Sequence, residues 1–256
     1  MFGGRKSWFA VALGLTLFGL GGFASTASAT FHLMKIREVS PGTGVGDSSY
    51  VEIQAYFPFQ NFLSQGAKVV RCDSTCSSPS VASSFNDVAN NANQMTVVFG
   101  DSGLASASKD FTVDLNLDSI EAGGAVCYLS EPGFSDCVSW GNFSANSTLM
   151  ANYGTTAGTP APALVSGMAL RRSITGNCPT ALDPSDDTDN SAADFAATTP
   201  DPRPNSSAPF EMPCPSTPVA IPTTHKKKCK KRKKPAAPTG PAYSAKKHKC
   251  KKKHRK

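Results

Sequence analysis

The feature that most constrains the fold is the stretch of residues 123–141, because its cysteines and apolar residues fit a single β-hairpin register. When Cys127 is placed opposite Cys137 in an antiparallel pair, the large apolar residues all fall on the other face of the hairpin. These residues are Val126, Tyr128, Val138 and Trp140. Directly opposed residues lie within disulfide range. The stretch therefore predicts a disulfide-bridged hairpin whose apolar face needs a second layer.

Further short stretches alternate apolar and polar residues or are rich in β-branched residues, which is typical of strands. They are residues 33–39, 50–57, 67–72, 94–99, 111–117, 168–172 and 193–197. In residues 50–57, the side chains expected to face inward are those of Val51, Ile53, Ala55 and Phe57. Residues 74–93 and 142–162 are expected to be loops. The pattern predicts an all-β protein, a β-sandwich with long loops.

The first 29 residues are typical of a secretory signal peptide. Arg5 and Lys6 precede an apolar run over residues 8–23, and a small-residue cleavage motif follows at residues 27–29. We expect cleavage before Thr30. An uncleaved membrane anchor is the alternative, although the run is short and glycine-rich for a membrane span. The mature chain is expected to be secreted, and it could be associated with the cell envelope.

Eight cysteines in an exported chain favour disulfides over metal or redox sites. Local spacing suggests two pairs, a third pair would close a long, loop-rich segment, and two cysteines remain near the C-terminus. The suggested pairs are Cys72–Cys76, Cys127–Cys137 and Cys178–Cys214, and the remaining cysteines are Cys229 and Cys250. Spacing alone does not prove this connectivity. The last two cysteines could cross-link C-terminal tails within one chain or between chains.

Charge divides the chain into two unlike parts. Residues 225–256 hold 14 Lys and two Arg with no acidic residue, which gives this tail a charge of +16. The signal peptide holds two more basic residues, so residues 30–224 keep eight of the 26 basic residues against all 19 acidic ones, a net charge of −11. An acidic body therefore carries a strongly basic arm.

The composition predicts four segments. A signal peptide (1–29) precedes a folded domain (30–198), a proline-rich linker (199–224) and a lysine-rich tail (225–256). Like charges at this density prevent collapse into a core, so the tail is expected to be disordered when free. Its basic residues are Lys226, Lys227, Lys228, Lys230, Lys231, Arg232, Lys233, Lys234, Lys246, Lys247, Lys249, Lys251, Lys252, Lys253, Arg255 and Lys256.

Several motifs together resemble the lamin-tail domain as it occurs in exported bacterial proteins, particularly the actinobacterial versions. The opening LMKIREV followed by YVEIQ, the motif DCVSWG, and the ending GMALRR with DDTDNSAADFAATTPDPRPN carry the resemblance, which spans roughly residues 33–205. It implies an immunoglobulin-like β-sandwich and no catalytic residue. In animals the domain belongs to nuclear lamins and contacts proteins and chromatin, whereas the exported bacterial versions look like binding or tethering modules.

Three further patterns bear on chemistry. The motif at residues 100–103, GDSG, resembles the nucleophile motif of trypsin-like proteases, but the only histidine of the body, His32, lies at its beginning. Tyr128 and Trp140 could line a sugar site, although their predicted face favours the core. The acidic segment at residues 183–194 could bind Ca²⁺, yet it lacks the EF-hand pattern and is more typical of an Asx-rich turn. The candidate metal ligands are Asp186, Asp187, Asp189, Asn190 and Asp194.

The basic tail suggests a polyanion as the partner. Dense lysines bind polyanions by releasing counterions, with an affinity that falls steeply with salt. Outside a cell, the polyanion could be teichoic acid, an anionic polysaccharide or lipid, extracellular DNA, or the acidic body of another copy. We expect a non-catalytic tethering module without a cofactor. The alternatives are a protein-recognition module with an incidental tail, and a metal-assisted hydrolase that uses residues 183–194.

Overall fold

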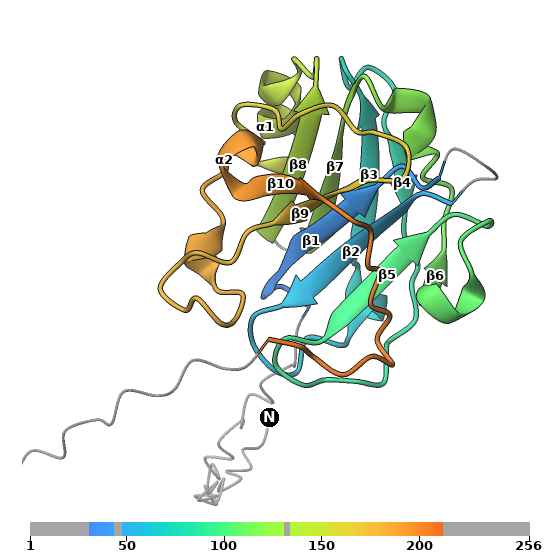
Figure 1. Ribbon diagram of the computed structural model, residues 1–256, viewed down its shortest axis with the longest axis vertical. Coiled ribbons are helices and arrows are strands. Elements are labelled where there is room, and N and C mark those ends of the chain that lie inside the picture. Colours follow the sequence, from blue (N-terminus) through green and yellow to red (C-terminus); the bar gives the residue numbers. More distant parts are fainter. Residues whose placement is uncertain (1–30, 44–47, 131–133, 212–256) are drawn as a thin grey trace, which may run out of the picture. The chain divides into compact units, whose positions relative to one another are not determined.

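The computed structural model describes residues 31–43, 48–130 and 134–211. These residues form two β-sheets that enclose a core (Figure 1). Sheet A has six strands in the order β10-β9-β1-β2-β5-β6, and sheet B has four in the order β4-β3-β7-β8. Neighbouring strands are antiparallel except β5 and β6. The prediction of an all-β sandwich is confirmed at this level.

The strands of sheet A are β1 (Met34–Ser40), β2 (Tyr50–Ala55), β5 (Thr96–Gly100), β6 (Phe111–Thr112), β9 (Ala169–Arg172) and β10 (Phe195–Thr198). Those of sheet B are β3 (Lys68–Asp73), β4 (Ser80–Ala82), β7 (Gly123–Ser130) and β8 (Phe134–Gly141). The α-helices are α1 (Asn146–Tyr153) and α2 (Ser191–Asp194). The 3₁₀ helices are η1 (Leu63–Gln65), η2 (Ser106–Ser108), η3 (Leu117–Ile120) and η4 (Pro184–Asp186).

The predicted hairpin is present as β7 and β8. Cys127 pairs with Cys137 and Val126 with Val138, as the sequence predicted. The valines, Tyr128 and Trp140 all belong to the main core between the sheets. The disulfide Cys127–Cys137 is formed, and so is Cys72–Cys76. A single strand register therefore both buries the apolar side chains in the core and brings the two cysteines together.

The outer face of sheet B carries a second apolar layer. Cys72, Cys127 and Cys137 belong to it, and Leu149 of α1 is fully buried there. Helix α1 lies in a stretch that we expected to be loop, because its sequence has almost no amphipathic pattern. Its C-cap is Gly154, which adopts a left-handed conformation with φ of +70°. A single buried leucine, not a periodic stripe, docks this helix.

Three strand predictions need correction. The strand predicted at residues 111–117 shrinks to β6, because the buried carboxylate of Asp101 accepts the backbone N–H groups of Leu115 and Asn116 and bends the chain away. Strand β2 ends at Ala55, so Phe57 does not face inward but is 56% exposed. Strand β4 forms inside the predicted loop at residues 74–93.

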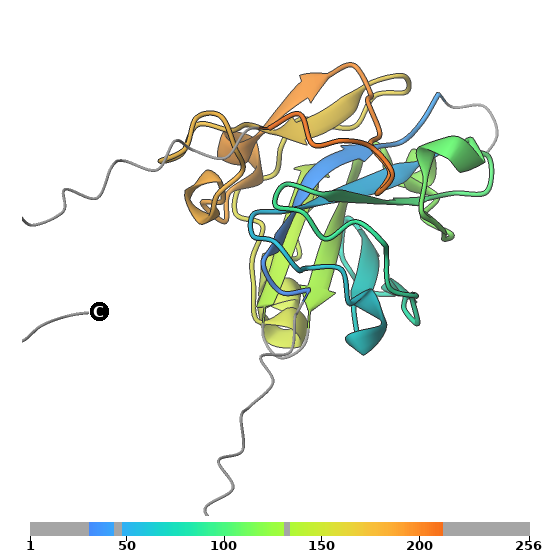
Figure 2. The same ribbon diagram turned by 90° about the horizontal axis from the view of Figure 1, so that it is seen from below.

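The segment from residue 199 is not simply a linker. Residues 199–211, which we call the strap, run along the outer face of sheet A (Figures 1 and 2). Arg203 and Asn205 of the strap are buried, with 8% and 5% exposure. The folded body therefore extends at least to Glu211. The rest of the predicted linker and the predicted disordered tail lie outside the described residues.

Removing the hairpin disulfide tests its contribution to stability. Replacing Cys127 and Cys137 with alanine should lower the free energy of unfolding by about 3 kcal/mol, because the cross-link restricts the unfolded chain. The matched change at Cys72 and Cys76 closes a shorter loop, with a sequence separation of 4 against 10, and should cost less. Urea denaturation of both variants measures the two losses. A greater loss for the shorter loop would contradict this ranking.

Candidate functional site

The most concentrated polar chemistry of the body surrounds Arg172. This residue lies on β9, and its side chain has no exposed surface. Its Nη2 donates to both carboxylate oxygens of Asp136 at 2.8 Å, and its Nε donates to the carbonyl oxygen of Ile36 at 2.9 Å. Its Nη1 reaches Asp187 at 3.0 Å and Asp194 at 3.4 Å. One guanidinium therefore ties β9 and β1 of sheet A to β8 of sheet B and to the acidic segment.

Lys35 extends this cluster toward solvent. Its ammonium lies 2.5 Å from a carboxylate oxygen of Asp187, and its side chain is 18% exposed. Burial would raise the pKa of Asp187, but the attraction of Arg172 and Lys35 outweighs burial and lowers this pKa to about 2. The same two cations face Asp136, whose complete burial still raises its pKa. We call Arg172, Lys35, Asp136, Asp187 and Asp194 the Arg172 cluster.

The candidate calcium ligands are distributed among protein donors. Asp186 accepts the backbone N–H groups of Thr175, Gly176 and Asp183 at 2.7 to 2.9 Å. Asp194 accepts the backbone N–H and the hydroxyl of Thr188.

Asp187 is held by Lys35 and Arg172, whereas Asp189 is exposed and Asn190 begins α2 as its N-cap. Within the described residues, no group of three or more His, Cys, Asp or Glu side chains is arranged to hold a metal ion. The segment is better described as a set of Asx turns that supplies counter-charge to Arg172.

A polar pocket of about 340 Å³ opens beside the cluster. It lies where β1 begins and where β7 and β8 approach the hairpin tip. Lys35 is already paired with Asp187 and Asp136 with Arg172, whereas the exposed Asp189 also lines the pocket. The pocket can hold a small polar molecule. Its lining residues are His32, Met34, Lys35, Tyr56, Tyr128, Ser130, Ser135, Asp136, Gly154, Thr155, Asp187 and Asp189.

The other two chemical candidates have structural roles. In the GDSG motif, Asp101 holds the loop after β5 through its bonds to Leu115 and Asn116. Tyr128 and Trp140 are 1% and 0% exposed. The Trp140 indole N–H donates to the carbonyl oxygen of Ile120 at 2.8 Å, and the Tyr128 hydroxyl donates to that of Phe31 at 2.9 Å. Both aromatics therefore belong to the core, and only Tyr128 also borders the polar pocket.

The strap forms a second charged site, which sequence reasoning missed. Proline has no backbone N–H. In the segment PDPRPN, proline alternates with residues that have this donor. Each of the three N–H groups donates to a carboxylate of the body. Asp201 donates to Glu38 at 2.9 Å, Arg203 to Glu52 at 2.8 Å, and Asn205 to Asp110 at 2.9 Å.

Arg203 locks the strap in place. Its guanidinium donates to Glu52 at 2.8 Å and to Glu211 at 2.8 Å, and Glu52 is 1% exposed. Burial raises the pKa of Glu52 to about 7 although Arg203 opposes the shift. The sequence offered one signal for this site, because the alternation in β2 places Glu52 on the outer face of the strand. It did not show that the strap covers that face.

A β-bulge in β1 supports the same site. The pairing of β1 with β2 shifts between Ile36 and Glu38, which lets both Ile36 and Val39 reach the core. Arg37 and Glu38 then both meet the strap. Arg37 lies 3.5 Å from Glu211, and Glu38 accepts from Tyr50, Arg171 and the strap.

The predicted tail site lies outside the described residues, as do Cys229 and Cys250. Cys178 is disulfide-bonded, but its predicted partner, Cys214, is not among the described residues, so that pairing stays a prediction. Comparisons of the chain with protein-family models, curated proteins and solved structures found no match.

The pKa of Asp187 yields a pH prediction. A carboxyl whose pKa falls from 3.8 to about 2 on folding stabilises the protein above pH 3.8, and this contribution is lost as the pH falls through about 2. Asp187→Asn should therefore lower the free energy of unfolding by about 2 kcal/mol at neutral pH, and the difference should narrow as the pH falls. Urea denaturation across pH measures it. Asp189→Asn, at an exposed position, is the control, and an equal loss there would contradict the assignment.

Arg203→Ala tests the strap. The variant leaves Glu52 buried without its cation, which should cost roughly 3 kcal/mol. The loss should grow above pH 7, because there the unmodified protein ionises Glu52 beside Arg203, whereas in the variant the pKa of Glu52 is higher still and the carboxyl stays protonated. Adding Glu52→Gln should recover much of the loss. Arg71→Ala, which removes hydrogen bonds to Asn116 and Ser119, is the control, and a similar loss in both single variants would refute a special role for Arg203.

Proposed function

We propose that this protein is an exported, non-catalytic binding or tethering module, in which a β-sandwich body carries a basic arm that attaches to anionic polymers of the cell envelope or the extracellular matrix. The observation that carries the proposal is the charge division between the body, at −11, and residues 225–256, at +16. No acidic residue interrupts the arm. Such a segment favours binding to a polyanion over packing into a domain.

Export is supported from two sides. Two disulfides hold sheet B, and they are compatible with an oxidising compartment. Phe31, which closely follows the predicted cleavage point, already belongs to the core, since it is 1% exposed and its carbonyl accepts from Tyr128. In the described part of the chain, no helix is long and apolar enough to cross a membrane.

The lamin-tail identity and its immunoglobulin-like topology are part of the proposal. Four of the motif stretches that carry the resemblance become neighbours in sheet A. The opening motifs form β1 and β2, and the ending motif forms β9, the acidic segment and β10, in the order β10-β9-β1-β2. Arg172 of LRR binds Asp187 and Asp194 of the ending motif. These contacts give the motif residues a shared structural role, which supports the resemblance.

A non-catalytic role fits the contacts of the charged residues. The carboxylates of Asp136, Asp186 and Asp194 are buried and bonded to protein donors. The alternative of a metal-assisted hydrolase would need some of these oxygens for an ion. Their use in internal hydrogen bonds and ion pairs favours a scaffold role for the body.

The test replaces the 16 basic residues of the arm with glutamine in the mature, full-length protein. Binding to teichoic acid and to duplex DNA is measured across a salt series. We expect the unmodified protein to bind with an affinity that falls steeply with salt, by a log–log slope of about −0.9 for each duplex phosphate contacted. The glutamine variant should lose this binding and keep the unfolding midpoint of the body. Equal binding by both proteins would refute the proposal.

A further inference from the structure

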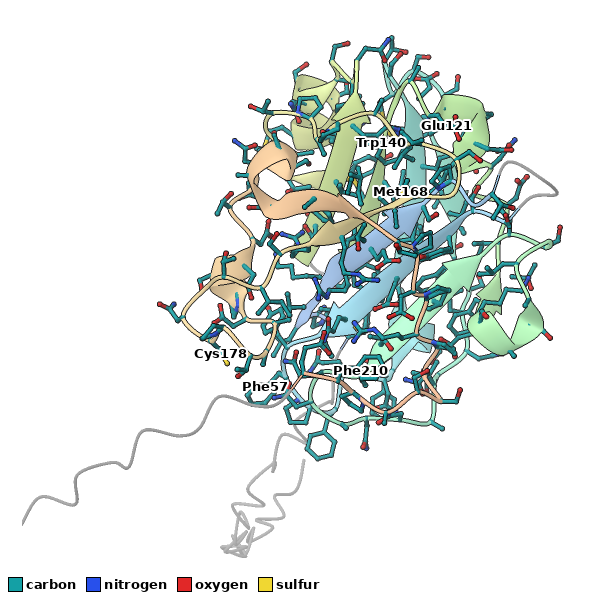
Figure 3. The ribbon with its side chains drawn as sticks, in the orientation of Figure 1. Phe57, Glu121, Trp140, Met168, Cys178 and Phe210 are labelled. Carbon is teal, nitrogen blue, oxygen red and sulfur yellow. A yellow bond between two sulfur atoms is a disulfide. The ribbon has the colours of Figure 1, made fainter. Side chains whose placement is uncertain are left out.

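Exposed aromatic side chains gather at one end of the body. Among the described residues, the large exposed hydrophobic side chains include three phenylalanines, and the other four are aliphatic. Phe57, Phe59 and Phe210 are 56%, 56% and 70% exposed. Figure 3 shows Phe57 and Phe210 at the same end of the sandwich, where the loop after β2 and the end of the strap lie. Phe59 belongs to the same loop as Phe57.

The loop that carries two of these rings is held in a defined conformation. Phe59 has a φ of +65°, which is rare for a bulky residue, and its N–H donates to Asn91 at 2.8 Å. The neighbouring Gln60 is 3% exposed, accepts from the Leu33 N–H and donates to the Pro58 carbonyl. The polar part of the loop is therefore anchored inside while the rings stay outside. Backbone strain of this kind persists where the surroundings enforce it, and it gathers at functional sites.

Phe210 is fixed by the strap. Glu211, the next residue, accepts two hydrogen bonds from Arg203, and the Arg203 guanidinium lies 5.5 Å from the centre of the Phe210 ring. The ring nevertheless remains 70% exposed. Two independent pieces of backbone thus present phenyl rings to solvent, and each piece is held by buried polar contacts.

The sequence that follows the strap points to the kind of surface that these rings contact. Glu211 is followed by 45 residues, and the lysine-rich tail begins at residue 225. Fourteen residues separate Phe210 from the tail, which span at most about 50 Å when extended. An apolar contact and a polybasic segment within such a distance are the two signals that together give stable attachment to an anionic bilayer.

We propose that this end of the body docks on an anionic lipid surface, with Phe57, Phe59 and Phe210 inserted at the level of the headgroups while the tail lysines bind lipid phosphates. This inference rests on the proposed function and names lipid as the anionic partner. Soluble polyanions such as teichoic acid or DNA can engage the tail, but they offer no apolar phase to three phenyl rings.

The test uses the mature, full-length protein and vesicles of phosphatidylcholine with or without phosphatidylglycerol. The aromatic variant combines Phe57→Ala, Phe59→Ala and Phe210→Ala, and the control combines Val81→Ala and Val165→Ala, which are also exposed. We expect the aromatic variant to bind anionic vesicles roughly tenfold or more weakly, and to lose the binding that survives high salt. The control should bind as the unmodified protein does. Binding of soluble polyphosphate should be the same in all three.

A second measurement keeps the test valid if the aromatic variant misfolds. Phe57→Trp in the otherwise unmodified protein should show a blue-shifted emission with anionic vesicles and no shift with polyphosphate. Unchanged vesicle binding by a folded aromatic variant, or an unshifted emission of the introduced indole, would overturn docking while leaving the tail function intact. Weaker polyphosphate binding by the aromatic variant would overturn it too, because the rings would then belong to a polymer site. If the glutamine variant of the arm loses vesicle and polymer binding while the aromatic variant keeps both, the result supports the proposed function and overturns the docking.

Discussion

The fold depends on one fully buried guanidinium. Arg172 binds Asp136 on the opposite sheet, Ile36 on the next strand, and Asp187 and Asp194 in the acidic segment, and it stacks on Phe195 at 4.6 Å. Removing any partner of such a buried charge leaves another group uncompensated, which costs far more than a surface ion pair contributes. The ion pairs of Arg172 therefore hold the irregular chain between β9 and β10 in place. The ion pair of the same residue with Asp136 also connects the two sheets at this position.

The strap applies the same principle on the outer face of sheet A. Alternating prolines leave only every second N–H free, and each free N–H meets a carboxylate of the body. Several carboxylates of the body are thus bonded to protein donors, at Glu38, Glu52, Asp110, Asp136, Asp186 and Asp194. The positive charge of residues 225–256 has no counterpart within its own segment. This difference is the physical basis for assigning binding to the arm and scaffolding to the body.

Local patterns predicted the parts of the fold that local rules determine. The period-two alternation around Cys127 and Cys137 fixed the hairpin register, and short β-branched runs located β1, β2, β3 and β5. The elements that the sequence did not predict depend on tertiary contacts. Asp101 ended the strand predicted at residues 111–117, one buried leucine docked α1, and the strap looked like a linker because its partners lie far away in the sequence, Glu52 being 151 residues from Arg203. The exposure of Phe57 was also missed, since β2 was expected to continue through this residue.

The central claim is that the arm binds anionic surfaces and the sandwich serves as its scaffold. The most direct measurement is residue-resolved NMR of the mature, ¹⁵N-labelled protein, titrated first with polyphosphate and then with anionic lipid particles. The account predicts that polyphosphate perturbs amide signals of residues 225–256 and spares β1, β3, β7 and β8. Lipid should perturb the same tail signals together with those around Phe57, Phe59 and Phe210. Changes confined to the Arg172 cluster and its pocket, with a silent tail, would contradict the account.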